Sequence, residues 1–572
     1  RYVRENDPHL PILLQSSDRK HRAAAAECGA GFLYKHSKNL LNSLRRYIRR
    51  HYGFGEFLFR NPETKEVIDR AADLQELQRK ITELPEATLR FHFDSDHMTK
   101  WLRTRALFPL ADVIAKEIPD HSDVEGTRRK LHDIMSAFRE YQGQGTIAEF
   151  SRNRYDRYLT FARIGDGSLG GKGRGLAFID FILKQTHLRN KYPGVQIAIP
   201  KTVVLTTEVF QDFVDRNGLS DLQTADLSDS QVLDHFLTAG FSKSIREDLR
   251  AILGVNTRPL AIRSSSLLED SSYQPFAGVY STFLLPNNAT TLDQRESDLE
   301  TAIKCVYAST YYQATRDYMA ITNNLIAEEK MAVIIQEVSG TVYRDRCFPS
   351  ISGVARSLNF YPIENESPED GIAYVAVGLG KTVVEGGAAV RFSPKHPRKV
   401  MQLSDPEMAV RESQKTFYSV NMELGPFSGS LDDGEPLRHD EVTEATGDPS
   451  FPLIASTYEF EDGRLRDGYR GTGEPIITFA GILKHRMFPL AEVVSDLLDV
   501  AAREMNVPVE IEFALDLNPE PGQPKKFSFL QVRPIVEGLE AEDVAIDDVP
   551  GEAAMAYSTS ALGNGVYDNL RD

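Results

Sequence analysis

Apolar residues follow two different periods along this chain, and each period predicts a different kind of element. Leu40, Leu44 and Ile48 recur at helical spacing, and helical patterns are also found over residues 71–84, 97–114, 124–142, 176–183 and 302–318. Short apolar runs predict buried strands over residues 10–14, 32–34, 260–262, 282–285, 331–338, 509–516 and 527–534. Because strands and helices alternate, we expect a mixed α/β (α+β) fold.

Composition narrows the class of protein. The net charge is −17, which argues against non-specific binding to nucleic acid. The three cysteines, Cys28, Cys305 and Cys347, fit neither a disulfide framework nor a zinc site. We see no signal peptide and no apolar run long enough to span a bilayer, so we expect a cytoplasmic protein without a membrane partner.

The stretch from Pro259 to Pro286 combines a buried strand with charged and small polar residues. Arg263 follows the apolar residues 260–262 and precedes three serines, and Gly278 and Thr282 lie further along. A guanidinium beside small hydroxyl residues and a glycine suits a grip on polyphosphate. The alternative is a surface loop in which Arg263 pairs with Glu269 or Asp270, and the stretch alone leaves both interpretations open.

A glycine-rich turn over residues 164–175 precedes an apolar helix and contains Lys172. Glycines let backbone N–H groups approach phosphate oxygens, and the N-terminus of the following helix favours an anion. The turn lacks the spacing of a Walker A loop. Lys172 is the natural cation for a phosphate in this turn.

Four polar residues alternate along two predicted strands near the end of the chain. Glu510 and Glu512 share one face of the first strand, and Gln531 and Arg533 share one face of the second, because side chains alternate with period two. An antiparallel pair of these strands puts two carboxylates, an amide and a guanidinium on one patch. Such a patch suits Mg²⁺ and phosphate, although an exposed polar sheet face explains the pattern as well.

The order of these motifs along the chain matches that of a known family. Gly170-Gly171-Lys172, Pro200 to Thr207, Arg263-Ser264-Ser265, Glu269-Asp270 and Phe276-Ala277-Gly278 together resemble the ATP-binding domain of the pyruvate phosphate dikinase and phosphoenolpyruvate synthase family. The resemblance covers about residues 155–540. It implies an ATP-grasp-like fold of two subdomains and a MgATP-binding phosphotransferase.

The resemblance also implies roles for individual residues. Lys172, Arg263 and Arg533 would act on the phosphates, the last on the group in transfer. Gly278 and Thr282 would cover the phosphates, and Gln336 would lie near adenine. Glu512 and Gln531 would serve Mg²⁺, with Glu510, which replaces the aspartate common in that family, as a weaker ligand. The glycine-rich loop 377–387 also matches the family, but we assign no role to its Lys381.

The N-terminal part resembles a different family. The strand–helix–strand–helix pattern of residues 1–52 resembles the second half of a response-regulator receiver domain, with Ser16 and Lys35 at its switch positions and His36 in place of the usual proline. A generic α/β packing module is the alternative. His92 and His97 in the following connector form either a metal site or, as we expect, part of a polar loop.

We therefore expect five segments in a chain of 572 residues, which is too long for one core. They are a partial receiver-like segment (1–52), a mainly helical connector (53–150), two subdomains of an ATP-binding domain (151–300 and 301–540), and an acidic tail (541–572) that looks like the start of another domain. The chain begins in what looks like the middle of a domain, so we expect a fragment.

Two hypotheses about function remain open. None of the 13 histidines lies in the Gly-rich Thr/Ser-x-His-Ala context of the family's swivelling phosphocarrier domain, and no pyruvate-binding barrel is seen. We expect phosphoryl transfer from ATP to an acceptor outside the chain. A phosphocarrier histidine in another domain, pyruvate, a glucan, a small drug-like alcohol and a protein all stay open as the acceptor. The alternative is an ATP-sensing regulatory module coupled to the receiver-like segment, without phosphoryl transfer.

Overall fold

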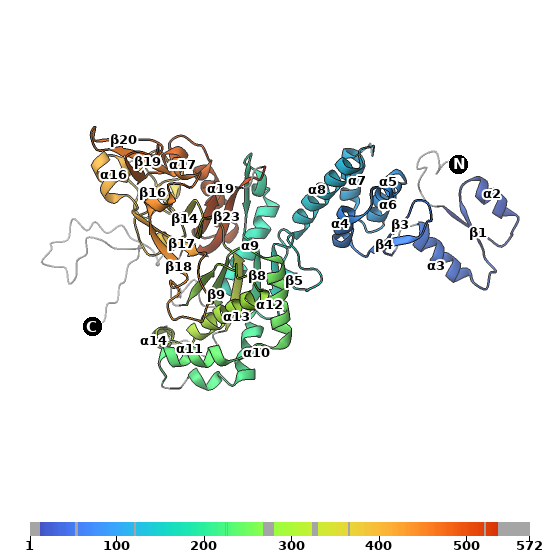
Figure 1. Cartoon of the computed structure of the whole chain (residues 1–572), viewed down its shortest axis with the longest axis horizontal. Helices are drawn as coiled ribbons and strands as arrows, with labels where there is room; N and C mark the ends of the chain where they lie inside the picture. Colours follow the sequence, from blue (N-terminus) through green and yellow to red (C-terminus); the bar gives the residue numbers. More distant parts are fainter. Residues whose placement is uncertain are drawn as a thin grey trace. The chain divides into compact units, whose positions relative to one another are not determined.

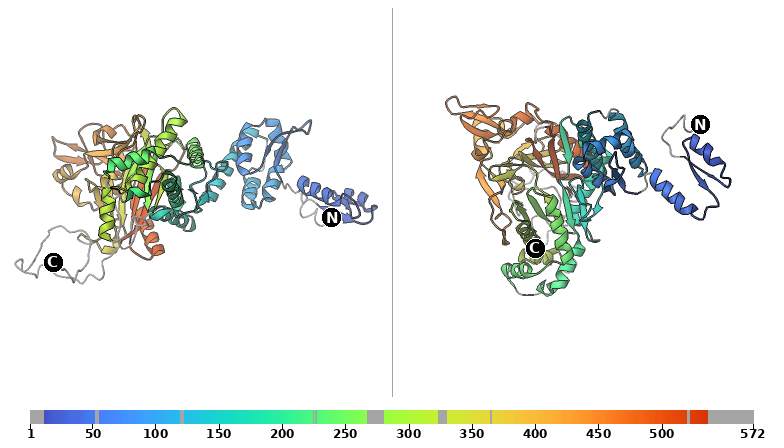
Figure 2. Two further views of the ribbon diagram at one scale, coloured as in Figure 1. Left: turned by 90° about the horizontal axis from the view of Figure 1, so that it is seen from below. Right: turned by 45° about the vertical axis from the view of Figure 1, so that its right-hand side comes forward.

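The computed structural model describes residues 12–51, 55–118, 122–223, 225, 227–266, 280–322, 330–363, 366–519 and 522–535. It divides into two compact units, Arg1–Gln142 and Gly143–Asp572. Figure 1 labels helices and strands of both units, and Figure 2 shows two further views. Gly278, the acidic pair Glu269 and Asp270, and the tail beyond residue 535 lie outside the described residues.

The first unit begins with the predicted strand–helix–strand–helix pattern. β1 (Leu13–Ser16) pairs in parallel with β2 (Gly31–Tyr34), and α2 (His21–Glu27) and α3 (Leu40–His51) follow them in turn. Ser16 ends β1, and its carbonyl accepts a hydrogen bond from the backbone N–H of Lys35 at 2.9 Å. Parallel pairing thus brings the two predicted switch positions to one sheet edge.

The connector contains a hairpin that the sequence pattern did not predict. β3 (Phe57–Arg60) pairs antiparallel with β4 (Val67–Ala71), and helices follow: α4 (Leu74–Glu83), α5 (Glu86–Asp94), α6 (His97–Arg103), α7 (Phe108–Glu117) and α8 (Val124–Gly143). The single helix expected over 97–114 is two helices, because the backbone at Ala106 takes a φ of 58°. Trp101 is 3% exposed in the shared core, as expected.

The second unit is built on two six-stranded sheets. The order in the first sheet is β10 (Thr282–Leu285), β9 (Leu260–Ser266), β11 (Met331–Glu337), β8 (Thr202–Leu205), β6 (Phe161–Ile164) and β5 (Ala148–Glu149). Side chains of β11 alternate between two cores: Val333 and Ile335 face one, and Ala332 and Ile334 face the other. Period two therefore explains why this strand is apolar throughout.

The second sheet carries the polar strands near the end of the chain. Its order is β16 (Val390–Phe392), β15 (Ile372–Ala376), β14 (Ile351–Arg356), β22 (Val509–Asp516), β23 (Lys525–Pro534) and β7 (Val195–Ala198). β22 and β23 are antiparallel, as predicted, and Glu510 lies opposite Arg533 while Glu512 lies opposite Gln531. Val509, Ile511, Phe513 and Leu515 point into the core from the other face of β22.

One helix packs against both sheets. α9 (Gly170–Gln185) contacts β9 of the first sheet and β23 of the second. Its residues Leu176, Ile179 and Leu183 are buried in the core that the two sheets share. The opposite face of the first sheet is covered by α10 (Thr207–Asn217), α11 (Asp229–Thr238), α12 (Lys243–Val255) and α13 (Leu292–Ser309), whose residues form the second core.

The two sheets interleave along the chain. β11 lies beyond residue 300 yet belongs to the first sheet, and β7 lies before residue 200 yet belongs to the second. The expected division into 151–300 and 301–540 therefore does not coincide with a division between sheets. Smaller sheets complete the unit: β12 (Thr341–Tyr343), β13 (Arg346–Phe348), β17 (Thr416–Asn421) and β18 (Leu437–Glu441), and separately β20 (Arg464–Arg466), β19 (Ala455–Glu459) and β21 (Glu474–Ile477).

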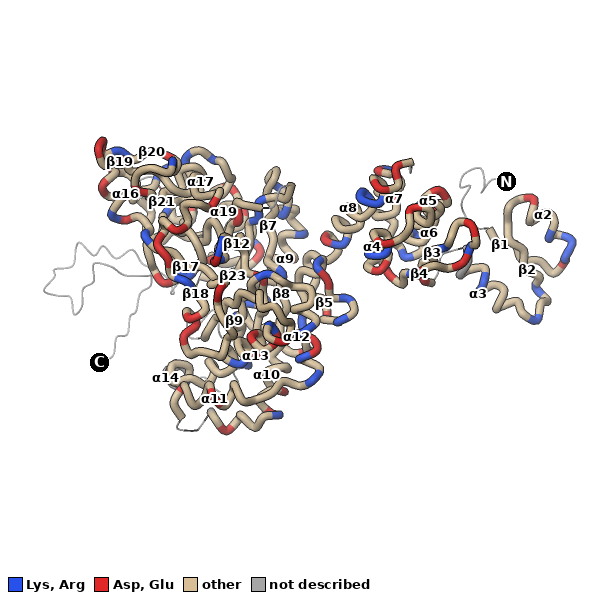
Figure 3. Tube along the Cα trace, in the orientation of Figure 1, with Lys and Arg blue, Asp and Glu red and all other residues tan. Residues whose placement is uncertain are grey.

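The remaining helices of the second unit are short apart from α19 (Leu490–Met505): α14 (Gln313–Thr322), α15 (Lys381–Val384), α16 (Pro406–Glu412), α17 (Phe451–Ile454) and α18 (Ala480–Leu483). In the part of the chain that the structure describes, no helix combines the length and apolar character needed to cross a membrane. Acidic and basic residues are interspersed along both units (Figure 3).

Candidate functional site

A cleft of about 1320 Å³ lies in the second unit, and strands of both six-stranded sheets line it. The predicted residues that line it come from α9, β9, β10, β11, β22 and β23: Lys172, Arg263, Thr282, Gln336, Glu510, Glu512, Gln531 and Arg533. Gly278 lies outside the described residues. The structure thus brings residues together that are up to 361 positions apart in the sequence.

The glycine-rich turn positions Lys172 by packing closely on β9. The buried hydroxyl of Ser265 donates to the carbonyl of Leu169 at 2.7 Å and accepts from the N–H of Gly173 at 2.9 Å. A Cβ on Gly170, which has a φ of 71°, would lie 1.7 Å from the carbonyl oxygen of Ser265. Only glycine permits this approach.

Lys172 itself reaches the cleft from this turn. Its Nζ donates to the hydroxyl of Ser264 at 3.3 Å. The N–H groups of Asp166 and Ser168 are bonded to side chains of α10, at Glu208 Oε2 and Thr207 Oγ1. We expected the backbone N–H groups of this turn to bind phosphate, but these two are hydrogen-bonded to α10 instead. Within the turn, Lys172 lines the cleft.

Arg263 lies within β9 rather than in a surface loop, and its side chain is 12% exposed. Its Nη1 donates to the carbonyl of Leu530 at 3.0 Å and, less closely, to Gln336 Oε1 at 3.4 Å. Its Nη2 donates to Gln531 Oε1 at 2.9 Å and lies 3.6 Å from Glu512 Oε2. The interpretation of Arg263 as part of a surface loop is therefore wrong.

A β-bulge explains how Leu530 can serve Arg263. The register between β22 and β23 shifts after Glu512, which opposes Gln531, because Phe513 opposes Phe529 and Leu530 is left without a partner. A bulged residue does not take part in the regular ladder, so its carbonyl is available for other contacts. Here the Leu530 carbonyl accepts from Arg263, across the gap between the two sheets.

Glu510 lies between two guanidinium groups. Its Oε2 accepts from Arg356 Nε at 2.5 Å and its Oε1 from Arg533 Nε at 2.7 Å, with a further bond from Arg533 Nη2. The Glu510 side chain is only 5% exposed, and the three residues are direct neighbours on β14, β22 and β23. Both oxygens of the Glu510 carboxylate are thus bonded to arginines. This favours a role for Glu510 in positioning Arg533 over a role as a metal ligand.

Two consecutive hydrogen bonds through Thr202 hold the side chain of Gln336. Its Nε2 donates to Thr202 Oγ1 at 2.9 Å, and that hydroxyl donates to the carbonyl of Pro200 at 2.7 Å. The side chain of Gln336 is buried, and its Oε1 faces Arg263. Gln336 therefore connects the strand of Arg263 to β8, and its amide is fixed in orientation.

Glu512, the other predicted carboxylate of the cleft, is compatible with a role as a Mg²⁺ ligand alongside substrate phosphates. Its side chain is 25% exposed and lies beside Gln531, whose amide oxygen has two lone pairs and can serve both Arg263 and a metal. Within the described ranges, no group of three or more His, Cys, Asp or Glu side chains is arranged to hold a metal. Mg²⁺ commonly takes one or two protein ligands together with substrate phosphates, so this donor set is compatible with it.

Arg356, Lys381 and Asp433 line the cleft but were not predicted as site residues. Arg356 pairs with Glu510, Lys381 at the start of α15 lies 3.3 Å from Asp433 Oδ1, and Asp433 also accepts from the backbone N–H of Thr282. The glycine-rich loop around Lys381 was noticed in the sequence. Nothing in the sequence connects Asp433 with it, because the two residues lie 52 positions apart.

His92 and His97 do not form a metal site in the first unit. His92 Nε2 accepts from the backbone N–H of Arg60 at 2.9 Å, and His92 Nδ1 lies 3.0 Å from His97 Nδ1. Burial is the main cause that lowers the pKa of His92 to about 3. His92 is therefore a neutral core residue bonded at both nitrogens, which differs from the polar loop that we expected.

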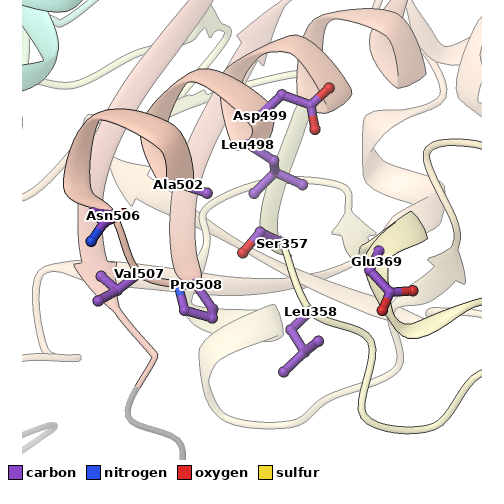
Figure 4. A pocket seen from close by; sticks show the side chains of 9 residues that line it. All are labelled: Ser357, Leu358, Glu369, Leu498, Asp499, Ala502, Asn506, Val507 and Pro508. Atoms are coloured by element: carbon purple, nitrogen blue, oxygen red, sulfur yellow. The ribbon is translucent and has the colours of Figure 1, made fainter.

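A second hollow of about 450 Å³ lies where the C-terminal half of α19 faces the segment after β14 (Figure 4). Its charged lining consists of Glu369 and Asp499, and the other residues that line it are apolar or neutral: Ser357, Leu358, Leu498, Ala502, Asn506, Val507 and Pro508. Without a cation, such a lining repels phosphate. The larger cleft is therefore the candidate site for an anionic ligand.

Comparison with known families agrees with this choice. Residues 166–551, about two thirds of the chain, match the family described as pyruvate phosphate dikinase, AMP/ATP-binding domain. The chain belongs to this family. Its matched region includes every strand that contributes a predicted residue to the cleft.

One curated protein is similar over a shorter region. It is a protein of Bacillus subtilis (strain 168) described as "Uncharacterized phosphotransferase YvkC", with 27% identity over 193 residues. The match covers 33% of the chain and spans only 20% of that protein's length. The family membership confirms the resemblance drawn from the motifs and supports ATP as the ligand. Because the family match begins at residue 166, the receiver-like character of residues 1–52 stays a prediction.

Proposed function

We propose that the cleft binds MgATP and is the nucleotide site of a phosphotransferase, which passes a phosphoryl group to a histidine or another acceptor outside the cleft. The observation that supports this most is the convergence of Lys172, Arg263 and Arg533 with Glu512 and Gln531 in one cleft of a domain belonging to an AMP/ATP-binding family. Cations for phosphate beside oxygen donors for a metal are what phosphoryl transfer requires.

Each group has a task in this proposal. Lys172 and Arg263 hold phosphate oxygens, and Thr282 of β10 lines the cleft beside them. Arg533, oriented by Glu510, compensates negative charge that develops on the group in transfer. Glu512 and Gln531 take Mg²⁺ together with the phosphates, and Gln336 lies on the adenine side. Mg²⁺ supplies charge neutralisation when bound.

A guanidinium has five N–H donors, and Arg263 uses three hydrogen bonds to protein groups in this structure. The residue can therefore hold the two sheets together and still donate to a phosphate. Because the Arg263 side chain contacts both sheets, we expect nucleotide binding to Arg263 to be coupled to the distance between the sheets.

Labelled nucleotide tests the proposal. The protein is incubated with ATP labelled at the β- or γ-phosphate, with pyruvate or with cell extract as the source of acceptor. We expect label to leave ATP in a reaction that needs Mg²⁺ and that falls by at least about 100-fold in Arg533→Ala, as for loss of a transition-state donor. Tight binding with no release of label under any condition would contradict transfer and favour ATP sensing. A phosphorylated histidine would have to be sought in other domains or proteins.

A further inference from the structure

At one edge of the cleft, a carboxylate lies between a lysine and a backbone N–H group. Asp433 Oδ1 is 3.3 Å from Lys381 Nζ, and Asp433 Oδ2 accepts from the N–H of Thr282 at 3.2 Å. Thr282 begins β10 and lies directly opposite Arg263 on β9. The Asp433 carboxylate thus binds the strand next to that of Arg263, which we assign to phosphate. The cleft is lined by all four residues: Arg263, Thr282, Lys381 and Asp433.

The loop between β17 and β18 fixes Asp433 in this place. Phe427 of the loop is 6% exposed in the core of the first sheet, 5.6 Å from the ring of Phe283, and its N–H donates to Asp298 Oδ1 at 3.0 Å. Asp432 Oδ1 accepts from the N–H of Gly434 at 2.8 Å. Phe427 therefore anchors the loop to the core of the first sheet, and the bond between Asp432 and Gly434 closes a turn around Asp433.

Lys381 is held as a cation. Its Nζ also lies 3.1 Å from Glu385 Oε1, one helical turn further on. Burial by itself would lower the pKa of Lys381, but Asp433 and Glu385 raise the pKa overall. Lys381 therefore keeps its charge over the physiological pH range, and the cleft has a cation at this edge that the motifs left without a role.

A carboxylate held by an ammonium and an N–H group marks a place that a phosphate oxygen fits, because the two anions need the same donors. The side chains of Lys381 and Asp433 are 28% and 34% exposed, and an ion pair at that exposure contributes little to stability. A phosphate carries more charge than a carboxylate. Exchange of one anion for the other is therefore favourable when a polyphosphate enters the cleft.

We propose that Lys381 and the N–H of Thr282 form a phosphate subsite, which the Asp433 carboxylate fills in this structure and which a phosphate oxygen of ATP takes over. The inference rests on the proposed function and adds two residues to it. Lys381 becomes a direct phosphate contact, and Asp433 becomes a built-in competitor that weakens nucleotide binding.

Affinities of four proteins test the subsite: wild type, Asp433→Asn, Lys381→Ala and the double variant. Each is titrated by calorimetry with MgATP and, as a probe without a base, inorganic tripolyphosphate. The amide in D433N would keep an oxygen for Thr282 but lose the charge, so this variant should bind both ligands about three- to tenfold more tightly. K381A should bind them at least about tenfold less tightly than wild type.

The double variant separates direct contact from simple neutralisation. If Lys381 contacts phosphate, the double variant binds about tenfold less tightly than D433N alone. If Lys381 only neutralises Asp433, the double variant binds as tightly as D433N, and the inference is overturned. It is also overturned if D433N binds no more tightly than wild type.

Controls separate this inference from the proposed function and from misfolding. Lys381→Arg keeps the charge and should retain affinity within about threefold, and Lys415→Ala removes a lysine that pairs with Glu474 outside the cleft and should change nothing. Thermal unfolding checks that every variant is folded. A wild type that binds neither ligand refutes the proposed function and the subsite together, whereas a wild type that binds and is insensitive to D433N and K381A refutes the subsite alone.

Discussion

Arg263 shows how much of the cleft depends on single residues. Its strand belongs to the first sheet, but its guanidinium donates to the Leu530 carbonyl and the Gln531 amide of the second. Ser265, two residues further along β9, holds the start of α9 and thereby Lys172. One short strand thus places a guanidinium and, through a neighbouring helix, an ammonium group at the same cleft.

Gly170 offers a test of this arrangement at the residue scale. Gly170→Ala should lower the free energy of unfolding by about 2–4 kcal/mol, because the new Cβ meets the Ser265 carbonyl at 1.7 Å and the residue has a left-handed φ. Urea denaturation followed by far-UV circular dichroism measures the change. The matched control is Gly254→Ala in α12, where a Cβ meets nothing within 4 Å and which should stabilise the protein by about 0.4–1 kcal/mol. Equal stabilities for G170A and wild type would show that the turn relaxes freely.

At the scale of elements, three adjacent strands share one row of charges. Arg356 on β14, Glu510 on β22 and Arg533 on β23 are cross-strand neighbours, so the buried carboxylate lies between two cations. The row holds Arg533 toward the cleft. The Glu510 side chain contacts both guanidinium groups, one with each oxygen.

Glu510→Gln tests whether this carboxylate serves structure or metal. The substitution leaves two guanidinium groups next to each other without a counter-charge, so we expect a loss of about 1–3 kcal/mol of unfolding free energy. The loss should be the same with and without MgCl₂ in differential scanning calorimetry. A destabilisation that appears only when Mg²⁺ and ATP are present would instead make Glu510 a metal ligand.

Period two explains why the sequence predicted these strands well. Alternation alone placed Glu510 and Glu512 on one face of β22, and the predicted antiparallel pairing put Gln531 and Arg533 beside them. The Leu530 bulge was not predictable, because a bulge depends on both strands at once. Asp433 was missed for a similar reason, since its contact with Thr282 joins residues 151 positions apart.

Helix prediction failed where a backbone turn interrupts an apolar pattern. Residues 97–114 keep helical spacing, but the chain takes a left-handed φ at Ala106 before α7 begins. β3 and β4 were missed because β3 is short and follows a glycine-rich stretch. Neither error affects the cleft, since both elements belong to the first unit.

At the scale of the whole molecule, the two units have separate cores, and the core of the first unit contains a histidine pair whose pKa values are lowered. The first unit buries His92 beside Phe57 and Phe59, and the half-buried His97 packs against the ring of His92. The pKa of His97 is lowered as well, chiefly by burial and then by Lys100. Protonation of either ring in the core is therefore unfavourable, and the first unit should be the acid-sensitive part.

The sign of this effect follows from the lowered pKa. His92 has a pKa of about 3 when folded and about 6.5 when unfolded, so between these values the unfolded chain binds the extra proton. The stabilisation is complete above about pH 6.5 and decreases by at most about 1.4 kcal/mol per pH unit as pH falls toward 3. Calorimetry from pH 4 to 8 should show this slope in the transition of the first unit. His92→Gln should remove most of it, the exposed His36→Gln should not, and a slope unchanged by H92Q would contradict the assignment.

The central claim is that Arg263 and its cleft bind ATP, and calorimetric titration with MgATP tests it most directly. Wild type should bind, and Arg263→Ala should lose about 1.5–3 kcal/mol of binding free energy, the range for a hydrogen bond to a charged group. Arg250→Ala removes an arginine that pairs with Asp293 and Glu296 away from the cleft, and it should bind as wild type does. No ATP binding by wild type, or equal affinities for R263A and R250A, would contradict the account.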